Sequence, residues 1–450
     1  MSAIIRFLHL EEVTRRSELA ILIGLGIMES FSWTLIKPML PLFATSLGAK
    51  ELLIGAIVAV PPLLQVFTRI PSGAAAVRYG KRRMIFLSFF LTTAGALVLT
   101  LTKSVALIFP AQMLLALGES MFWPANWAYV TSLAPRNKQG TIVALVMGVQ
   151  GVVGLLLPYV GGRIFDTYGF WVNGLIYVTA GVTGIMLATR LPKVEPASTR
   201  PAAAPGIAAP PAAGPAAVPG RRNSRVGARA LLARRTILVA AFSGSIVFFS
   251  WGISGAFYSI YVKEGLGFTA TTVGILLTWQ SAFNTLARLG FAQMAHRVRI
   301  ERTLFVMTLA NALPMMLLPW LRTLPLLMVV AAITGLSSGV VPISIKTLYA
   351  NATDDKERSV AMGIDGVAMN IGSLASPIVA GAAAQAIGIP STFFFGNLLT
   401  IAALFASRRL IDRPGFVRAI SGREPEVPPA EGDEVEDLVD RPTVAAGQGS

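Results

Sequence analysis

The stretch Arg69-Ile-Pro-Ser-Gly73, followed by Arg78, recurs 219 positions later as Arg288-Leu-Gly-Phe-Ala292, followed by Arg297 (288 − 69 = 219). After a slip of one residue the echo continues at a spacing of 218, in the pairs Pro124 and Pro342, Gly148 and Gly366, and Gly154 and Gly372. A long period of this kind indicates two copies of one structural unit in a single chain. The sequence therefore predicts two halves with the same order of elements.

Both copies are rich in apolar residues. Hydrophobic residues make up 54% of the 450 residues and charged residues 14%, whereas soluble proteins carry about 25% charged residues. Helices of about 20 apolar residues cross a membrane. We predict twelve, at 19–45, 52–72, 84–103, 106–133, 140–162, 168–191, 236–262, 270–293, 302–321, 323–350, 358–385 and 389–410. The expected fold is an all-α polytopic membrane protein with twelve transmembrane helices in two pseudo-symmetric six-helix bundles.

The net charge of +15 is distributed in a way that predicts orientation. With both termini in the cytoplasm, most Lys and Arg residues fall on cytoplasmic segments, as the positive-inside rule requires. Five fall on the outer side: Lys50, Lys103, Arg163, Lys263 and Arg322. We therefore expect a multi-pass protein of the cell (plasma) membrane, with the lipid bilayer as its surroundings. Nucleic acid is not an expected partner, because no reading module is recognisable.

The chain divides by composition into five parts. We predict a cytoplasmic N-terminus at 1–18, a first six-helix bundle at 19–191, a linker at 192–235, a second bundle at 236–410 and a cytoplasmic tail at 411–450. The linker is rich in Pro and Ala and then in Arg, and the tail is acidic, so neither can bury an apolar core. The two bundles are therefore expected to move relative to each other without restraint from the linker.

Several classes of function are excluded by what the chain lacks. It has no cysteine, so disulfides, thiolate metal sites and thiol nucleophiles are ruled out. No phosphate-binding loop of the Walker type is present, and neither His9 nor His296 lies in a metal-ligand pattern. We expect no enzyme activity, no cofactor and no metal. A sensor or receptor built on the same fold stays an alternative to a carrier.

The loop after the second predicted helix resembles a known family motif. It reads Gly73-Ala-Ala-Ala-Val77-Arg78-Tyr79-Gly80-Lys81-Arg82, and the major facilitator superfamily has Gly-x-x-x-Asp-Arg-x-Gly-Arg/Lys-Arg/Lys here. Val77 replaces the acid, and residues 292–299 form a degenerate second copy. The resemblance covers roughly 19–410. It implies a carrier of the twelve-helix type that works by alternating access, and we expect it to function as a monomer.

The same resemblance implies a gate at the cytoplasmic side. Its residues are Gly73, Arg78, Gly80, Lys81, Arg82, Arg288 and Arg297. A glycine at position 73 lets two helices approach closely, and Gly80 allows a tight turn. The basic side chains are placed to reach acidic groups or the C-terminal ends of helices. Because the acid is missing at Val77, we expect a gate that is weaker or latched differently.

Three membrane-embedded acids are candidates for binding a coupling proton: Glu29, Glu119 and Asp365. A carboxyl group in a partly dry cavity loses solvation in its charged form, so it can exchange a proton near neutral pH. A structural ion pair of Glu29 with Lys37 or Lys346 is the alternative. For Asp365 we also consider a pairing with the basic loop around Arg78.

Helical spacing also predicts a substrate cavity. Glu29, Trp33 and Lys37 are four residues apart, as are Glu119, Trp123 and Trp127, so each set is expected on one helix face. In the family, helices one, four, seven and ten line the central cavity. The candidates for contact with substrate are Trp33, Lys37, Trp123, Asn126, Trp127, Trp251, Tyr258 and Lys346. Aromatic faces suit amphipathic or cationic organic ligands, and Lys346 suits an anion.

A partial signature favours one direction of transport. Proton-driven efflux members of the family carry Gly-Pro-x-x-Gly-Gly in helix five, and this chain has Leu157-Pro158 followed by Gly161-Gly162. We therefore expect a drug/proton-antiporter-like carrier that moves a small organic solute, with proton-coupled efflux of amphipathic compounds as the first hypothesis. Proton-coupled uptake of a sugar or organic anion is the alternative.

Overall fold

The computed structural model describes residues 15–133, 139–192, 228–294, 298–353 and 357–411, which are helical and contain no β-strand. The first half comprises α2 (Arg16–Phe31), η1 (Ser32–Ile36), α3 (Leu40–Ser46), α4 (Glu51–Tyr79), α5 (Lys81–Leu101), α6 (Val105–Thr131), α7 (Gln139–Tyr168) and α8 (Phe170–Thr189). The second comprises α9 (Ala228–Leu231), α10 (Arg235–Ile260), η4 (Tyr261–Gly265), α11 (Ala270–Met294), α12 (Ile300–Leu317), η6 (Leu318–Trp320), α13 (Leu324–Asn351), α14 (Arg358–Ile387) and α15 (Ile389–Ile411). Predictions for residues 1–14, most of the linker, Arg297 and the tail beyond 411 concern residues outside these ranges.

Eleven of the described helices are long and apolar enough to cross a membrane. Eleven of the twelve predicted segments are thus confirmed as helices that can span a membrane. The exception is 270–293, which corresponds to α11. Polar residues such as Gln280, Asn284 and Arg288 dilute its apolar character. Its 25 residues nevertheless extend over about 37 Å at 1.5 Å per residue, and it packs between α7 and α13.

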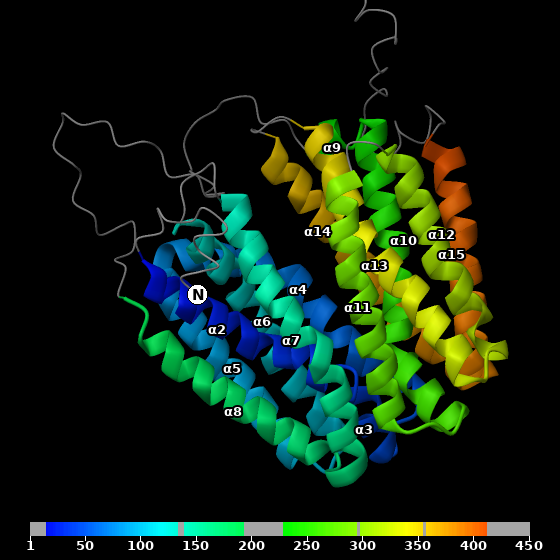
Figure 1. Cartoon of the computed structure of the whole chain (residues 1–450), viewed down its shortest axis with the longest axis horizontal. Helices are drawn as coiled ribbons and strands as arrows, with labels where there is room; N and C mark the ends of the chain where they lie inside the picture. Colours follow the sequence, from blue (N-terminus) through cyan, green and yellow to red (C-terminus); the bar gives the residue numbers. More distant parts are fainter. Residues whose placement is uncertain (1–14, 134–138, 193–227, 295–297, 354–356, 412–450) are drawn as a thin grey trace, which may run out of the picture.

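The two halves form separate groups of helices that meet at one end of the molecule (Figure 1). We call the end that contains the turn at Gly80, between α4 and α5, the basic end. The other end, where Gly169 separates α7 from α8, is the opposite end. In Figure 1 the two groups diverge towards the top and converge near α3 at the bottom. Contacts between the halves run along α4 with α14 and α7 with α11.

Four glycines bring the halves together at the opposite end. A Cβ at Gly55 would overlap the carbonyl oxygen of Pro377, and one at Gly274 would overlap that of Pro158. A Cβ at Gly162 would overlap the carbonyl oxygen of Ala270, and one at Gly381 would lie 2.8 Å from that of Glu51. Each of these contacts has its counterpart 219 positions away (274 − 55 = 219 and 381 − 162 = 219). The closure therefore follows the internal repeat, and helix backbones touch there because glycine has no side chain.

At the basic end the same helix pairs are apart. A Cβ added at Gly73, Gly148, Gly290 or Gly366 would meet no other atom within 4 Å. The buried apolar residues agree with this picture. At the opposite end one core runs through both halves, from Leu35 in the first to Phe257 in the second, whereas each half has its own core towards the basic end. Gly73 thus has no helix against it here, contrary to the expectation of close packing.

A π-helical turn interrupts the first long helix of each half. η1 follows α2 and η4 follows α10, but η4 begins 229 positions after η1 (261 − 32 = 229), later in its helix than the repeat of 219 would place it. A π turn contains more residues than an α turn and shifts the side chains that follow it around the helix axis, and such turns are frequent at functional sites. The turn at η1 precedes Lys37, which carries charge into the centre of the molecule.

A buried polar cluster joins three helices of the second half and can be tested for its effect on stability. The Ser250 hydroxyl donates to Asn397 Oδ1 at 2.7 Å and lies 3.4 Å from Asn311 Oδ1. Ser250→Ala is expected to cost about 1–3 kcal/mol, because a buried carbonyl oxygen loses its donor. The apparent melting temperature in detergent measures this loss.

Ser254→Ala is the matched control for that substitution. Ser254 lies one turn further along α10, and its hydroxyl donates only to the carbonyl of Ser250 in the same helix. We expect the melting temperature of this variant to stay close to that of the wild type. Equal melting temperatures for the two variants would contradict the assigned role of Ser250.

Candidate functional site

A cavity of about 660 Å³ lies between the halves. It opens towards the basic end, since the halves are in contact at the opposite end. Its lining comes from α2 and η1, α4, α6 and α7 of the first half and from α11 of the second. The residues are Ser30, Trp33, Thr34, Gln65, Arg69, Glu119, Trp123, Pro124, Trp127, Met147, Gln150, Gly151 and Arg288. The first half supplies all of these side chains except Arg288.

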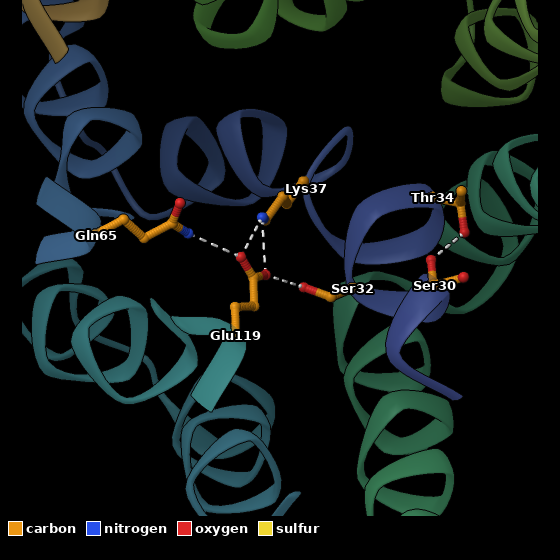
Figure 2. A network of polar contacts seen from close by, with 6 residues as sticks. All are labelled: Ser30, Ser32, Thr34, Lys37, Gln65 and Glu119. Atoms are coloured by element: carbon orange, nitrogen blue, oxygen red, sulfur yellow. Dashed lines mark hydrogen bonds and ion pairs between the residues drawn. The ribbon is translucent and has the colours of Figure 1, made fainter. Parts of the chain in front are cut away.

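Glu119 is the polar centre of this cavity (Figure 2). Its carboxylate is bound by Lys37, with Nζ 2.8 Å from Oε1 and 2.9 Å from Oε2. Ser32 donates to Oε1 at 3.0 Å and Gln65 donates to Oε2 at 3.3 Å. Donors from η1, α4 and the residue after η1 thus converge on one carboxylate of α6. Such complete pairing offsets the cost of burying a charge.

Lys37 connects this carboxylate to an aromatic ring. Its Nζ lies 3.3 Å from the centroid of the Trp33 ring, a cation–π contact. Trp33 is 51% exposed and lines the cavity, as predicted. Trp123 and Trp127 also line it, with rings stacked at a centroid distance of 5.9 Å. The spacing of four residues along α6 correctly placed Glu119 and both tryptophans on one face.

Glu29 does not line the cavity. It is 1% exposed, and its Oε1 has no hydrogen-bond partner among the described residues. The prediction that Glu29, Trp33 and Lys37 share one face assumed α-helical geometry throughout. The π turn at Ser32–Ile36 changes the number of residues per turn. The alternative ion pair between Glu29 and Lys37 is not formed, because Lys37 binds Glu119.

The second half contains a related contact without the acid. Asn284, 219 positions after Gln65 (284 − 65 = 219), donates to the Ser338 hydroxyl at 2.8 Å. The spacing of 218 that relates Pro124 to Pro342 makes the neighbouring Ser337 the counterpart of Glu119 (337 − 119 = 218). Serine therefore occupies the position that corresponds to the carboxylate. The carboxylate that lines the cavity, Glu119, belongs to the first half.

Other predicted residues of the second half lie away from this cavity. Lys346 is bound to Asp365, with Nζ 3.2 Å from Oδ2. Asp365 is thus paired with a neighbouring helix of its own half and not with the loop around Arg78. Tyr258 is buried in the apolar core, and Trp251 packs against Phe248 at a centroid distance of 4.8 Å. None of them lines the cavity in this conformation, in which only α11 of the second half reaches it.

One more predicted cavity residue is hidden. Asn126 is completely buried, and neither atom of its amide group has a partner among the described residues. It precedes Trp127 on α6 and therefore points away from the face that Glu119, Trp123 and Trp127 share. The prediction that Asn126 contacts substrate receives no support from its position.

The predicted gating loop is a tight turn held by helix ends. Gly80 has φ of +90°, a conformation that glycine adopts without strain. Lys81 donates to the carbonyl of Ala128 at 2.7 Å and Arg82 to that of Thr189 at 2.6 Å. These carbonyls lie at the ends of α6 and α8, so the predicted contact with helix C-termini is confirmed. Arg78 lies over the ring of Tyr79 at 5.3 Å.

The structure contains a polar contact between the halves at the opposite end that we did not predict from the sequence. Asp166, near the end of α7, accepts hydrogen bonds from the backbone N–H groups of Ala270 at 3.0 Å and Thr271 at 2.7 Å, and from the Thr271 hydroxyl at 2.6 Å. It thereby caps α11 of the other half. Nearby, Lys263 lies 4.5 Å from the ring centroid of Phe165. The sequence feature that could have indicated this contact is the acid itself, which follows a long apolar run.

Removing this cap is expected to loosen the closure of the opposite end. Asp166→Ala should cost about 1 kcal/mol, as for other capping residues, which shifts the ratio of closed to open molecules about fivefold. Spin labels on cysteines introduced at Ser46 and Glu264, both exposed at this end, would report a larger population at long distance. The absence of native cysteine makes the labelling specific.

Asp166→Asn is the graded control for that experiment. Its amide keeps one oxygen as an acceptor, so we expect a smaller shift than for alanine. A distance distribution that is the same in the wild type and the alanine variant would show that glycine packing alone holds the halves together.

Comparison with known proteins agrees with this architecture. The family profile of the Major Facilitator Superfamily matches residues 22–250 and 240–446. Among relatives, the putative multidrug resistance protein MdtD of Salmonella paratyphi B is 25% identical over 418 residues, which cover 82% of this chain and 88% of that protein. Some other matches are shorter. The riboflavin transporter RibZ of Clostridioides difficile is 23% identical over 132 residues, and the match covers 29% of each protein.

Solved structures show the same fold. The nucleoside transporter NupG superimposes with a TM-score of 0.69 at 14% identity, covering 88% of this chain and 98% of that chain. A bacterial homologue of the lysosomal transporter Spinster, in an inward-facing and unoccupied conformation, gives a TM-score of 0.66 at 14% identity, with coverage of 91% and 97%. Because the profile covers both halves and the helices are arranged as in these carriers, the chain belongs to the major facilitator superfamily and is a transporter.

Proposed function

We propose that this transporter exports amphipathic organic compounds and that protons drive the export. Glu119 carries the proton, and the tryptophans of the cavity contact the compound. The observation that supports this most directly is the position of Glu119, which lines the cavity and is bound by Lys37 at the same time. An acid in that position can respond both to protons and to a ligand.

The ion pair suggests how a proton and a ligand are linked. When Glu119 takes up a proton, it loses its charge, and the attraction that holds Lys37 falls away. Lys37, which already contacts Trp33, is then free to move towards a ligand. Because Ser32 begins the π turn of the first helix and Lys37 follows it, a change at Glu119 acts directly on that helix. Glu29, buried behind this site, is a second proton-binding candidate.

Orientation follows from the charges. We propose that the basic end faces the cytoplasm of a cell with this protein in its plasma membrane, because Lys and Arg are retained on that side. Both termini then lie in the cytoplasm. The cavity opens to the cytoplasm in this conformation, which is the state that admits a compound for export. The loop at Gly73–Arg82, with Arg297, acts as a gate when the basic end closes.

The aromatic lining and the relatives favour efflux. Trp33, Trp123 and Trp127 offer flat apolar surfaces, which suit organic compounds with rings. The long match to a putative multidrug resistance protein points in the same direction. Proton-coupled uptake of an organic anion is the second candidate, and it is favoured by Arg69 and Arg288 in the cavity lining.

Transport in oriented vesicles tests the proposal. A panel of aromatic solutes is offered to inverted and right-side-out proteoliposomes, with and without a pH gradient. We expect accumulation in inverted vesicles when their interior is acidic and loss of accumulation when a protonophore removes the gradient. Accumulation that ignores the gradient would refute proton coupling, and accumulation in right-side-out vesicles with an alkaline interior would establish uptake instead.

A further inference from the structure

We propose that the compound bound in the cavity is an organic anion, held between Arg69 of the first half and Arg288 of the second. The inference rests on the proposed function, because it takes the cavity to be the substrate site. It assigns these two arginines a direct contact with substrate, whereas the sequence predicts only a gating role for Arg288.

The charges of the cavity lining support an anion. The charged side chains that line it are Arg69, Arg288 and Glu119, and the charge of Glu119 is offset by Lys37 at 2.8 Å. Neither arginine forms an ion pair or a hydrogen bond with any residue in the part of the chain that the structure describes. Two positive charges therefore face the same space without a counter-ion, and they raise the local concentration of anions there.

The internal repeat places the two arginines at the same depth. Arg69 lies 18 residues after the start of α4 at Glu51, and Arg288 lies 18 residues after the start of α11 at Ala270. Each stands four residues beyond the polar contact of its own half, which is Gln65 with Glu119 in one and Asn284 with Ser338 in the other. Both are therefore one turn, about 6 Å, closer to the basic end than these contacts.

An aromatic surface lies at that level as well. Trp123 is four residues beyond Glu119 on α6, which runs in the same direction as α4, so Trp123 and Arg69 stand at similar depths. Trp127 follows one turn later and stacks on Trp123. A ligand with an anionic head between the arginines can thus lay a flat ring on the tryptophans. Guanidinium groups bind carboxylate, sulfonate and phosphate oxygens through paired hydrogen bonds.

The position of the two arginines means that a bound ligand affects closure of the basic end. Arg69 and Arg288 belong to different halves, which are apart at this end in the present conformation. An anion bound by both neutralises two like charges that would otherwise repel each other as the basic end closes. The ligand therefore favours closure, which is the step that must follow binding.

Binding of three matched probes tests the proposal. 2-Naphthoate, 2-naphthylmethanol and 2-naphthylmethylammonium share one ring system and differ in charge. Isothermal titration of the full-length protein in detergent, without a gradient, is expected to give a dissociation constant for naphthoate at least about tenfold lower than for the other two. Equal affinities, a preference for the ammonium, or no binding of naphthoate would overturn the proposal.

Substitutions then test whether the two arginines contact the bound naphthoate. Arg69→Gln and Arg288→Gln are each expected to weaken naphthoate binding about tenfold or more and to leave the alcohol unaffected. Arg69→Lys keeps the charge and should retain part of the affinity. Arg302→Gln removes an exposed charge from α12, outside the cavity lining, and should change nothing. Wild-type affinity in both Gln variants, with altered closure of the basic end, would establish gating alone.

These measurements are independent of proton coupling. Because no gradient is present in the titration, a carrier that is not driven by protons would still show the preference for naphthoate. Conversely, a proton-driven carrier that binds all three probes equally would refute the anion site and leave the proposed export intact.

Discussion

Replacing Glu119 by glutamine is expected to reduce proton-driven accumulation to the level of protein-free vesicles. The amide keeps an oxygen for Ser32, but it cannot take up and release a proton near neutral pH. Exchange of substrate across the membrane without a gradient should continue, because the tryptophans and arginines of the cavity remain. Accumulation and counterflow in the same proteoliposomes measure the two activities separately.

The Glu119→Gln variant leaves Lys37 without its counter-ion, so the loss of stability that this causes needs a control. Removing one partner of a buried ion pair costs about 3–5 kcal/mol when the other has no replacement, although Lys37 is 23% exposed and keeps its contact with Trp33. The double variant Glu119→Gln with Lys37→Met removes both charges and should restore stability without restoring coupling. Glu264→Gln, at an exposed acid of the opposite end, is expected to transport like the wild type. Gradient-driven accumulation by the Glu119 variant would disprove the assignment.

Gly162→Val is expected to prevent closure of the opposite end. A Cβ at Gly162 would overlap the carbonyl oxygen of Ala270 and lie 3.1 Å from the Cα of Thr271. Both atoms belong to the backbone of α11, so no rotation of a side chain relieves the contact. Overpacking of this kind costs about 1–3 kcal/mol, which corresponds to a shift of about 5- to 150-fold towards molecules that are open at this end.

Two readouts follow the expected shift. Alkylation of a cysteine at Met147, an exposed residue of the cavity lining, should slow down when reagent is added to the basic end. Spin labels at Ser46 and Glu264 should move apart. Gly255→Val on α10 is the control, because a Cβ there meets no atom within 4 Å. Unchanged alkylation in the Gly162 variant would mean that α7 and α11 do not need this contact.

Much of the fold could be read from the sequence because its causes are local. Apolar segments of about 20 residues become helices in a membrane whatever their neighbours are, since each backbone polar group needs an internal partner. The exception is α11, which is not apolar enough to be recognised as a membrane span because it contains Gln280, Asn284 and Arg288. These residues face other helices and the cavity. The interior of the protein, and not lipid, accommodates that side of the helix.

The site could be predicted only in part. The spacing of Glu119, Trp123 and Trp127 was sufficient because α6 is α-helical throughout. The same reasoning misplaced Glu29, since the π turn at η1 is not visible in the spacing of residues. It also paired Asp365 with the loop around Arg78 of the other half, whereas Asp365 is bound by Lys346 of its own half. Which of several neighbouring helices a charged side chain meets depends on how the helices rotate and cross, and periodicity does not contain this information.

The sequence by itself determined that the chain has two related halves, that its helices lie in a membrane and that it belongs among the carriers. These properties follow from the composition and from a repeat of 219 residues. Both can be recognised in the sequence because they depend on neighbouring residues and not on how the helices pack. The tertiary structure alone decided that Lys37 binds Glu119, that Asp166 caps a helix of the other half and that Arg69 and Arg288 face one cavity. The physical reason is distance along the chain. Partners separated by roughly 80 to 220 positions meet only when whole bundles have packed against each other.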